Sequence, residues 1–243
     1  MPLKTPRVAL VTGGMGGLGE AICIKLAGLG YKVVTTHSPG NTKAAEWLDA
    51  MNKQGYGFRA HGCDVADYDS TVACVQKVVA EVGPVDVLVN NAGITRDMTF
   101  KKMDKVNWDA VLRTNLDSLF NMTKQVADGM TERGWGRIIN VSSVNGSKGA
   151  FGQTNYSAAK AGVHGFTKAL AQETGGLVLQ TNDLVAGLTQ VADESRVTYL
   201  LGYEPTNGKR DGRYRKLGVE VRRPGLQIRA RTGYFAPKGG VGK

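Results

Sequence analysis

The chain has 243 residues, of which 42% are hydrophobic, and a formal net charge of +10. This length and composition can bury the core of one α/β domain. No run of about 18 apolar residues is present, which predicts no transmembrane helix and no membrane partner, and the short polar start, Met1 to Arg7, does not predict a secretory signal.

The first 173 residues alternate between strand and helix patterns. Short apolar runs predict five strands at Arg7–Thr12, Lys32–Thr36, Gly57–Cys63, Val85–Val89 and Gly136–Ser142. Apolar residues at helical spacing predict helices at Glu20–Gly30, Thr42–Gln54, Tyr68–Val82, Val106–Arg133 and Tyr156–Glu173. This alternation predicts an α/β fold, a Rossmann-like doubly wound parallel sheet, in which ligands bind beyond the carboxyl ends of the strands.

The pattern changes after residue 173. Leu177–Thr181 and Arg196–Tyr203 are predicted strands, with a short helix between them at Asn182–Glu194. The chain is therefore divided into three parts: a dinucleotide-binding core at 1–173, an atypical strand–helix–strand segment at 174–206, and a basic β-hairpin tail at 207–243.

The tail carries most of the charge. It holds eleven Lys or Arg and two acidic residues, a net +9, whereas residues 1–206 carry +1. Period-two alternation at Tyr214–Arg222 and Leu226–Arg231, around Arg223-Pro224-Gly225, predicts an antiparallel hairpin. A basic stretch could attract a polyanion, but no nucleic-acid motif accompanies it. A solvated hairpin without a nucleic-acid partner is favoured, and a basic-tailed binding protein is an alternative.

The cysteines indicate the compartment. Cys23, Cys63 and Cys74 lack metal-ligand spacing, and an odd number leaves one unpaired in any disulfide scheme. The sequence therefore predicts no metal site and a location in the reducing cytoplasm.

A glycine-rich turn, Thr12-Gly13-Gly14-Met15-Gly16-Gly17-Leu18-Gly19, joins the first predicted strand to the first helix. Glycines let the backbone approach a pyrophosphate closely, and a helix N-terminus supplies free N–H groups and a positive dipole end. The strand before and the helix after favour a dinucleotide site over a merely flexible turn. The predicted contacts are Gly13, Met15, Gly16, Gly17, Leu18 and Gly19.

The end of the second strand bears on the choice of cofactor. An acidic residue there would bind the ribose of NAD, but the sequence reads Val34-Thr35-Thr36-His37-Ser38. Lys43 follows shortly after and could meet a 2′-phosphate, which favours NADPH. Asp64, with Val65 after it, ends the third strand and could cap the adenine, or it simply starts a loop.

Tyr156 and Lys160 are four residues apart, which places them on one face of a helix. A lysine ammonium beside a phenol favours the phenolate and prepares a general acid. Ser143 ends the fifth strand and could donate a hydrogen bond to a carbonyl oxygen on which charge develops. The spacing alone is common on solvated helix faces, so its meaning depends on Ser143 and on the nucleotide turn.

These motifs resemble the short-chain dehydrogenase/reductase family. The resemblance rests on Thr12-Gly13-x-x-x-Gly17-x-Gly19, Asn90-Asn91-Ala92-Gly93, Asn115, Ser143 and Tyr156-x-x-x-Lys160. It implies that Tyr156 protonates the substrate oxygen and Ser143 polarises it. It also implies that Lys160 favours the phenolate and holds the nicotinamide ribose, that Asn115 positions a relaying water, and that Asn91, Ala92 and Gly93 line the cofactor cleft. The family usually forms homotetramers, which makes a homo-oligomer an expectation.

A closer similarity is to bacterial acetoacetyl-CoA reductases of polyhydroxybutyrate synthesis. It rests on Gly93-Ile94-Thr95-Arg96-Asp97, Trp108-Asp109-Ala110-Val111, Arg133 to Ile138, Ser143 to Gly146 and Phe151 to Tyr156. It implies NADPH-dependent reduction of acetoacetyl-CoA to (R)-3-hydroxybutyryl-CoA. Phe151 and Gln153 would face the acyl group, or only shape the loop. Reduction of a 3-oxoacyl carrier protein is the alternative activity.

This resemblance ends near residue 173. The last seventy residues instead resemble the segment that follows von Willebrand factor A-like domains in some bacterial proteins, through pieces such as Tyr199 to Tyr203 and Arg210 to Lys216. The sequence therefore predicts a chimera that lacks the family's substrate lid. Because a lid completes such a site, a nucleotide-binding chimera with little or no activity is a further alternative.

Overall fold

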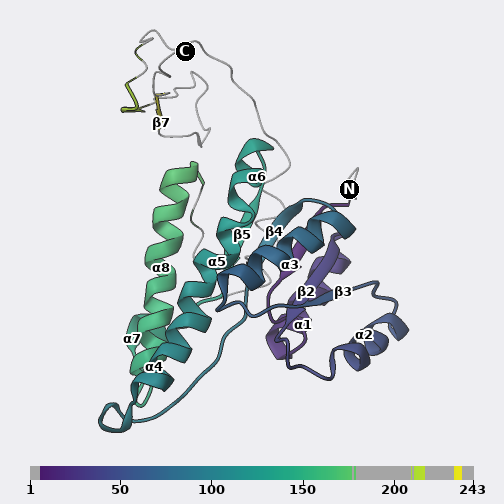
Figure 1. The fold of residues 1–243 in the computed structure, drawn as a ribbon, viewed down its shortest axis with the longest axis vertical. Coiled ribbons are helices and arrows are strands. Elements are labelled where there is room, and N and C mark those ends of the chain that lie inside the picture. Colours follow the sequence, from purple (N-terminus) through teal and green to yellow (C-terminus); the bar gives the residue numbers. More distant parts are fainter. Residues whose placement is uncertain (1–5, 177, 179–208, 210, 217–232, 237–243) are drawn as a thin grey trace, which may run out of the picture. The chain divides into compact units, whose positions relative to one another are not determined.

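The computed structural model describes residues 6–176, 178, 209, 211–216 and 233–236 (Figure 1). The chain forms two compact units, residues 1–165 and 166–243. Predicted elements at Asn182–Glu194 and Arg196–Tyr203, and at Leu177–Thr181 apart from Val178, lie outside the described residues. The resemblance of the C-terminal segment and the three predicted domain ranges therefore stay predictions.

The first unit is built on one parallel sheet. Its strands are β1 (Val8–Val11), β2 (Lys32–His37), β3 (Arg59–Gly62), β4 (Val85–Asn90) and β5 (Arg137–Asn140). They lie in the order β3-β2-β1-β4-β5, and every pairing is parallel. The predicted doubly wound sheet is confirmed. The strand order reverses beside β1, which places the ligand-binding crevice beyond the carboxyl ends of β1 and β4.

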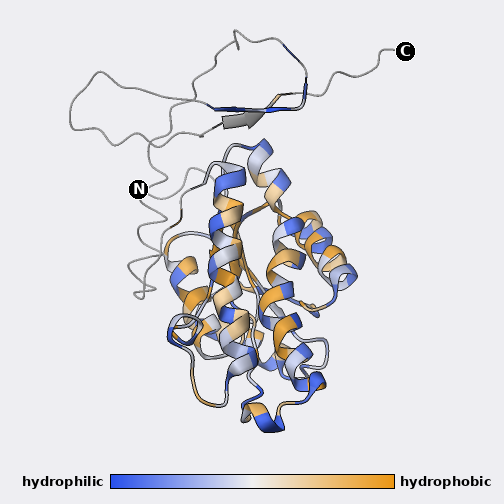
Figure 2. Cartoon of the chain, turned by 90° about the vertical axis from the view of Figure 1, so that its left-hand side faces the viewer, coloured by the Kyte–Doolittle hydropathy of each residue, from blue (hydrophilic) through white to orange (hydrophobic). Residues whose placement is uncertain are grey.

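Helices cover this sheet (Figure 2). They include α1 (Gly17–Gly28), α2 (Ala44–Lys53), α3 (Tyr68–Glu81) and α8 (Thr154–Thr174), and the short elements η1 (Phe100–Lys102) and α7 (Asn145–Lys148), which the sequence pattern did not predict. The Asp67 side chain caps α3 by accepting a hydrogen bond of 2.7 Å from the Ser70 N–H, which satisfies one free donor of the first turn.

The prediction of one continuous helix at Val106–Arg133 is wrong. The segment divides into α4 (Lys105–Leu112), a π-helical turn η2 (Arg113–Asp117), α5 (Ser118–Lys124) and α6 (Ala127–Glu132). The π turn carries Asn115, whose side chain bonds to the backbone of Ile94. An inserted residue of this kind is typical of functional sites.

The core of the first unit lies on both faces of the sheet. All four residues of β1 are buried, and so are five of the six in β4. Near-continuous apolar runs are typical of parallel strands that are covered on both sides, and in Figure 2 the strands are mainly orange. Val34, Val78 and Met122 belong to one buried hydrophobic cluster with residues of β1 and β4.

The second unit contains the last turns of α8 and a two-stranded antiparallel ladder. Strands β6 (Tyr214–Lys216) and β7 (Gly233–Phe235) pair with Tyr214 opposite Phe235. The antiparallel pairing agrees with a hairpin, but its second strand is Gly233–Phe235, and the predicted range Leu226–Arg231 lies outside the described residues. Within the part of the chain that the structure describes, no helix is long and apolar enough to cross a membrane.

Candidate active site

The glycine-rich turn forms an open cradle at the start of α1. Gly13 and Gly17 adopt φ of +63° and +37°, which favours residues without a Cβ. A Cβ at Gly16 or Gly17 would meet nothing within 4 Å among the described residues, and α1 begins without a side-chain cap. The first N–H groups of α1 are thus available to an anion. The turn therefore fits the pyrophosphate of a dinucleotide.

Thr12 and Asn91 hold this turn against the end of β4. The Thr12 hydroxyl accepts hydrogen bonds of 3.0 Å from the N–H groups of Asn91 and Ala92. The Asn91 amide nitrogen donates to the carbonyls of Thr12 and Gly13, at 3.0 and 3.1 Å. The Thr12 hydroxyl and the Asn91 amide nitrogen therefore both have hydrogen-bond partners. The predicted cofactor contacts Asn91 and Ala92 lie next to the glycine-rich turn.

Threonines at the end of β2 face the same turn. The Thr35 hydroxyl accepts a bond of 2.8 Å from the Gly14 N–H and donates one of 2.9 Å to the Val11 carbonyl, and the Thr36 hydroxyl accepts from the Gly13 N–H at 3.3 Å. These two positions carry hydroxyl groups and no carboxylate. The Met15 sulfur lies 3.6 Å from the Asn41 amide nitrogen, which connects the turn with the loop that follows β2.

Three predicted cofactor residues lie on loops or at a helix start. Lys43 is exposed at the N-terminus of α2. The exposed Asp64 carboxylate accepts a bond of 3.0 Å from the Ala66 N–H, which is the geometry of a loop-starting aspartate. Val65 is buried, and its carbonyl accepts from the Asn121 amide at 3.0 Å. Contact of these residues with a cofactor stays a prediction.

Tyr156 and Lys160 lie on the first turns of α8. The Lys160 Nζ atom is 5.7 Å from the centre of the Tyr156 ring, so the predicted shared face is confirmed. Lys160 is only 5% exposed, and its Nζ donates to the Val141 carbonyl at 2.8 Å. Burial lowers the pKa of Lys160 from 10.5 to about 8, because a low-polarity surrounding disfavours the charged ammonium.

The chain between β5 and α7 packs tightly on α8. A Cβ at Gly146 would lie 2.7 Å from the Lys160 carbonyl carbon, so only glycine fits this approach. The Ser143 hydroxyl accepts a bond of 3.2 Å from the Asn145 N–H. The close packing brings Ser143, at the start of this segment, to the helix that carries Tyr156 and Lys160.

Asn115 and Gly93 meet beside Lys160. The Asn115 side chain is fully buried, and it accepts from the Ile94 N–H at 2.9 Å and donates to the Ile94 carbonyl at 2.7 Å. A Cβ at Gly93 would overlap the Asn115 Oδ1 atom and lie 3.8 Å from the Lys160 Nζ atom. The structure thus brings Gly93, Asn115 and Lys160 together from three distant parts of the sequence.

The two predicted substrate residues differ in their surroundings. Phe151 is 94% exposed and is available to a ligand. The Gln153 amide bridges two loops: its oxygen accepts from Asn145 at 2.9 Å, and its nitrogen donates to Asp97 at 2.7 Å. Gln153 therefore shapes the loop that leads into α8, and its contact with substrate stays a prediction.

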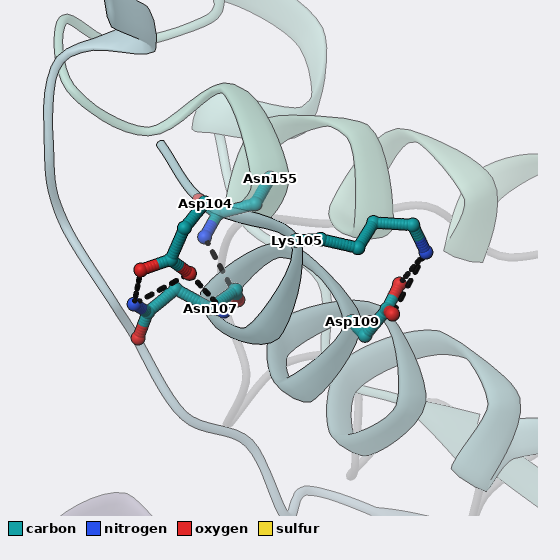
Figure 3. Close-up of polar contacts among 5 residues, drawn as sticks. All are labelled: Asp104, Lys105, Asn107, Asp109 and Asn155. Atoms are coloured by element: carbon teal, nitrogen blue, oxygen red, sulfur yellow. Dashed lines mark hydrogen bonds and ion pairs between the residues drawn. The ribbon is translucent and has the colours of Figure 1, made fainter. Parts of the chain in front are cut away.

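Asn155 connects the start of α8 with α4 (Figure 3). It is fully buried, and its amide nitrogen donates to the carbonyls of Arg96 and Asn107 at 3.2 and 3.4 Å. Asp104 caps α4 by accepting from the Asn107 N–H at 2.7 Å. On the same helix, Lys105 and Asp109 form an exposed ion pair of 2.6 Å. This network fixes the position of the residue that precedes Tyr156.

Four structural partners of the site were not among the predicted site residues. They are Thr12, Asn155, Ser142 and His164. His164 follows Lys160 by four residues and so continues the helix face of Tyr156, which is a signal in the sequence. The others bond to residues distant in sequence, and local patterns do not indicate such contacts.

Comparisons with known proteins agree with this geometry. Residues 7–197 match the model of the short chain dehydrogenases. The chain is 59% identical to an acetoacetyl-CoA reductase of Cupriavidus necator over 73% of each chain, and 52% identical to one of Allochromatium vinosum over 76% of each. It is 42% identical to a 3-oxoacyl-[acyl-carrier-protein] reductase of Pseudomonas aeruginosa over 82% of each. The family match extends past residue 173.

Proposed function

The chain belongs to the short-chain dehydrogenase family, and from that premise we propose that it reduces acetoacetyl-CoA to (R)-3-hydroxybutyryl-CoA with NADPH. One observation carries the proposal. A buried lysine on α8 lies beside Tyr156, and the turn of α8 that carries this lysine packs against Gly146, three residues after Ser143. Relatives with this activity in their names share about half or more of the aligned residues, which supports the same substrate.

In the proposed reaction, Tyr156 donates its phenolic proton to the carbonyl oxygen, and the Ser143 hydroxyl donates a hydrogen bond to that oxygen as charge develops. The Lys160 ammonium stabilises the resulting phenolate. Asn115 positions a water that returns a proton toward Lys160. The exposed Phe151 and the neighbouring Gln153 face the acyl group.

We assign the cofactor to the cradle at α1. NADPH supplies the hydride when bound. Gly13, Met15, Gly16, Gly17, Leu18 and Gly19 would hold its pyrophosphate; Asn91, Ala92, Gly93, Tyr156 and Lys160 would line the nicotinamide side; and Asp64 and Val65 would face the adenine. The hydroxyl groups of Thr35 and Thr36 leave no carboxylate at these positions, and Lys43 offers a cation at the start of α2. These features favour a 2′-phosphate over a free ribose hydroxyl.

The first test follows NADPH oxidation in the presence of acetoacetyl-CoA, with Tyr156→Phe as the control. We expect turnover that is lost in the variant, and a lower catalytic efficiency with NADH. Acetoacetyl-carrier protein is the second substrate. Turnover of the carrier-protein substrate alone would replace the proposed activity by that of the Pseudomonas aeruginosa relative. NADPH binding without turnover of either substrate would contradict the proposal.

Two further properties belong to the proposal. The three cysteines are free and buried, which suits a reducing cytoplasm. Val106 on α4 and Phe120 on α5 are 78% and 55% exposed, so both helices offer an apolar side chain to a partner subunit. We therefore expect a homo-oligomer, to be measured by light scattering with Val106→Asp as the disrupting variant.

A further inference from the structure

Ser142 and His164 are bonded to each other next to the candidate catalytic residue Lys160. Ser142 follows β5 and precedes Ser143, and His164 lies on α8 one turn after Lys160. Tyr156, Lys160 and His164 are spaced by four residues and therefore share a helix face. The proposed reaction uses neither Ser142 nor His164, although both contact its components.

The hydrogen bonds around Ser142 fix the proton on His164. The Ser142 Oγ atom lies 2.9 Å from the Lys160 carbonyl oxygen and 2.9 Å from the His164 Nε2 atom. A carbonyl only accepts, so the single hydroxyl hydrogen of Ser142 points to Lys160. The Ser142 oxygen then accepts from His164, which requires a hydrogen on Nε2. One arrangement thus satisfies all three groups.

These bonds join the end of β5 to the turn of α8 that carries Lys160. The Val141 carbonyl accepts from the Lys160 Nζ atom at 2.8 Å, and the next residue, Ser142, donates to the Lys160 carbonyl. Both the side chain and the backbone of Lys160 are therefore bound to consecutive residues. Ser143 comes directly after them, so its position depends on the same contacts.

We propose that Ser142 and His164 form a positioning pair, which holds the Lys160 turn of α8 against the end of β5. The pair thereby fixes the positions of Ser143 and of the Lys160 ammonium relative to Tyr156. The role of this pair in catalysis rests on the proposed function. A misplacement of about 1 Å at a reacting group can reduce a rate about 100-fold. Loss of the pair should therefore lower kcat much more than it weakens substrate binding.

The kinetic test compares Ser142→Ala, His164→Leu and the double variant with wild type. We expect each to lower kcat for acetoacetyl-CoA by about 10- to 100-fold, with KM changed less than about twofold. Because the two residues act as one unit, the kcat of the double variant should be no lower than the kcat of the less active single variant. A deuterated nicotinamide cofactor should show a larger isotope effect in each variant, since hydride transfer becomes slower relative to the other steps.

His164→Gln and Thr131→Val are the matched controls. The amide nitrogen of glutamine can donate a hydrogen bond to Ser142, so His164→Gln should recover most of the lost kcat. Thr131 lies on α6, outside the site, and its hydroxyl donates to a helix carbonyl, that of Ala127, at 2.9 Å. Thr131→Val removes a comparable bond and should leave kcat and the isotope effect unchanged.

Nitrogen-15 NMR of the His164 ring tests the pair without turnover. We expect wild type to carry the hydrogen on Nε2 at neutral pH, and the ring signals to move in Ser142→Ala. A hydrogen on Nδ1 alone, or unchanged signals in Ser142→Ala, would overturn the inference. So would wild-type kcat and isotope effects in both single variants. If wild type fails to reduce acetoacetyl-CoA, the proposed function fails, and the NMR outcome alone decides whether the pair exists.

Discussion

At the tip of the glycine-rich turn, Gly16 and Gly17 face open space among the described residues, whereas around Lys160 side chains and backbone crowd the helix. A Cβ added at Gly16 meets nothing within 4 Å among the described residues, but one at Gly146 meets the backbone of Lys160 at 2.7 Å. In the proposed function, the N–H groups of the turn would bind the pyrophosphate of the cofactor. The helix instead holds one buried cation in a fixed place. The two halves of the site should therefore respond differently to substitution.

The largest effect is expected at Gly19, where the open turn folds on itself. A Cβ there would overlap the Gly13 carbonyl oxygen and lie 2.8 Å from the Asn91 amide nitrogen. We expect Gly19→Ala to lower the free energy of unfolding by about 3 kcal/mol and NADPH affinity at least about 100-fold, measured by denaturation and by nicotinamide fluorescence. Gly28→Ala, in the same helix with no atom near its Cβ, is the control. Equal unfolding free energies and NADPH affinities in the two variants would contradict the close packing of Gly19 against Gly13 and Asn91.

At Lys160 the cost of burial should be visible as a pH dependence. Burial lowers the pKa of this lysine to about 8, below its unfolded value of about 10.4. Wild type therefore carries the full cost of a buried ammonium below pH 8, and this cost disappears as the pH rises from about 8 to 10.5.

Lys160→Met should thus be more stable than wild type at pH 7, by about 2 kcal/mol after loss of the bond to Val141, and should lose activity. Chemical denaturation of the cofactor-free protein at pH 7 and pH 10 measures the difference, which should shrink at the higher pH. A difference that grows with pH would contradict the assignment of burial as the cause.

Thr12 joins the two halves, because it holds the turn to the residues after β4. Thr12→Val keeps the shape but leaves the N–H groups of Asn91 and Ala92 without the hydroxyl that accepts from both. We expect a loss of between about 1 and 2 kcal/mol in the free energy of unfolding, with weaker NADPH binding. Thr12→Ser, which keeps the acceptor, should retain most of the stability. Equal losses in both variants would point to packing of the methyl group instead.

The smallest effect is expected at Asp104, which caps α4 at the edge of the catalytic half. Asp104→Ala should cost about 1 kcal/mol of unfolding free energy in thermal or chemical denaturation, with kcat reduced less than about threefold. Lys105→Ala, which removes only the exposed pair with Asp109, should change stability by less than about 0.5 kcal/mol. A larger effect from Lys105 than from Asp104 would reverse this interpretation.

The sheet could be predicted because its strands are short apolar runs that alternate with helices, and alternation alone nearly dictates parallel order. The helix face of Tyr156 and Lys160 follows from spacing in the same way. The π turn at Arg113–Asp117 could not be predicted, since the apolar pattern of Val106–Arg133 is close to helical. Its Asn115 side chain bonds to Ile94, 21 residues away, and a local pattern does not indicate such a contact. The partnership of Thr12 with Asn91, 79 residues apart, is equally invisible to local patterns.

The π turn at Arg113–Asp117 also limits how this chain can change by deletion. Removing one residue would restore a regular helix, but every later residue of α5 would rotate by about 100° about the axis. Leu119 and Met122, now buried, would leave the core together, and Asn115 would lose Ile94. A one-residue deletion in this turn would therefore displace the whole buried face of α5 at once, whereas a substitution beside the turn would not.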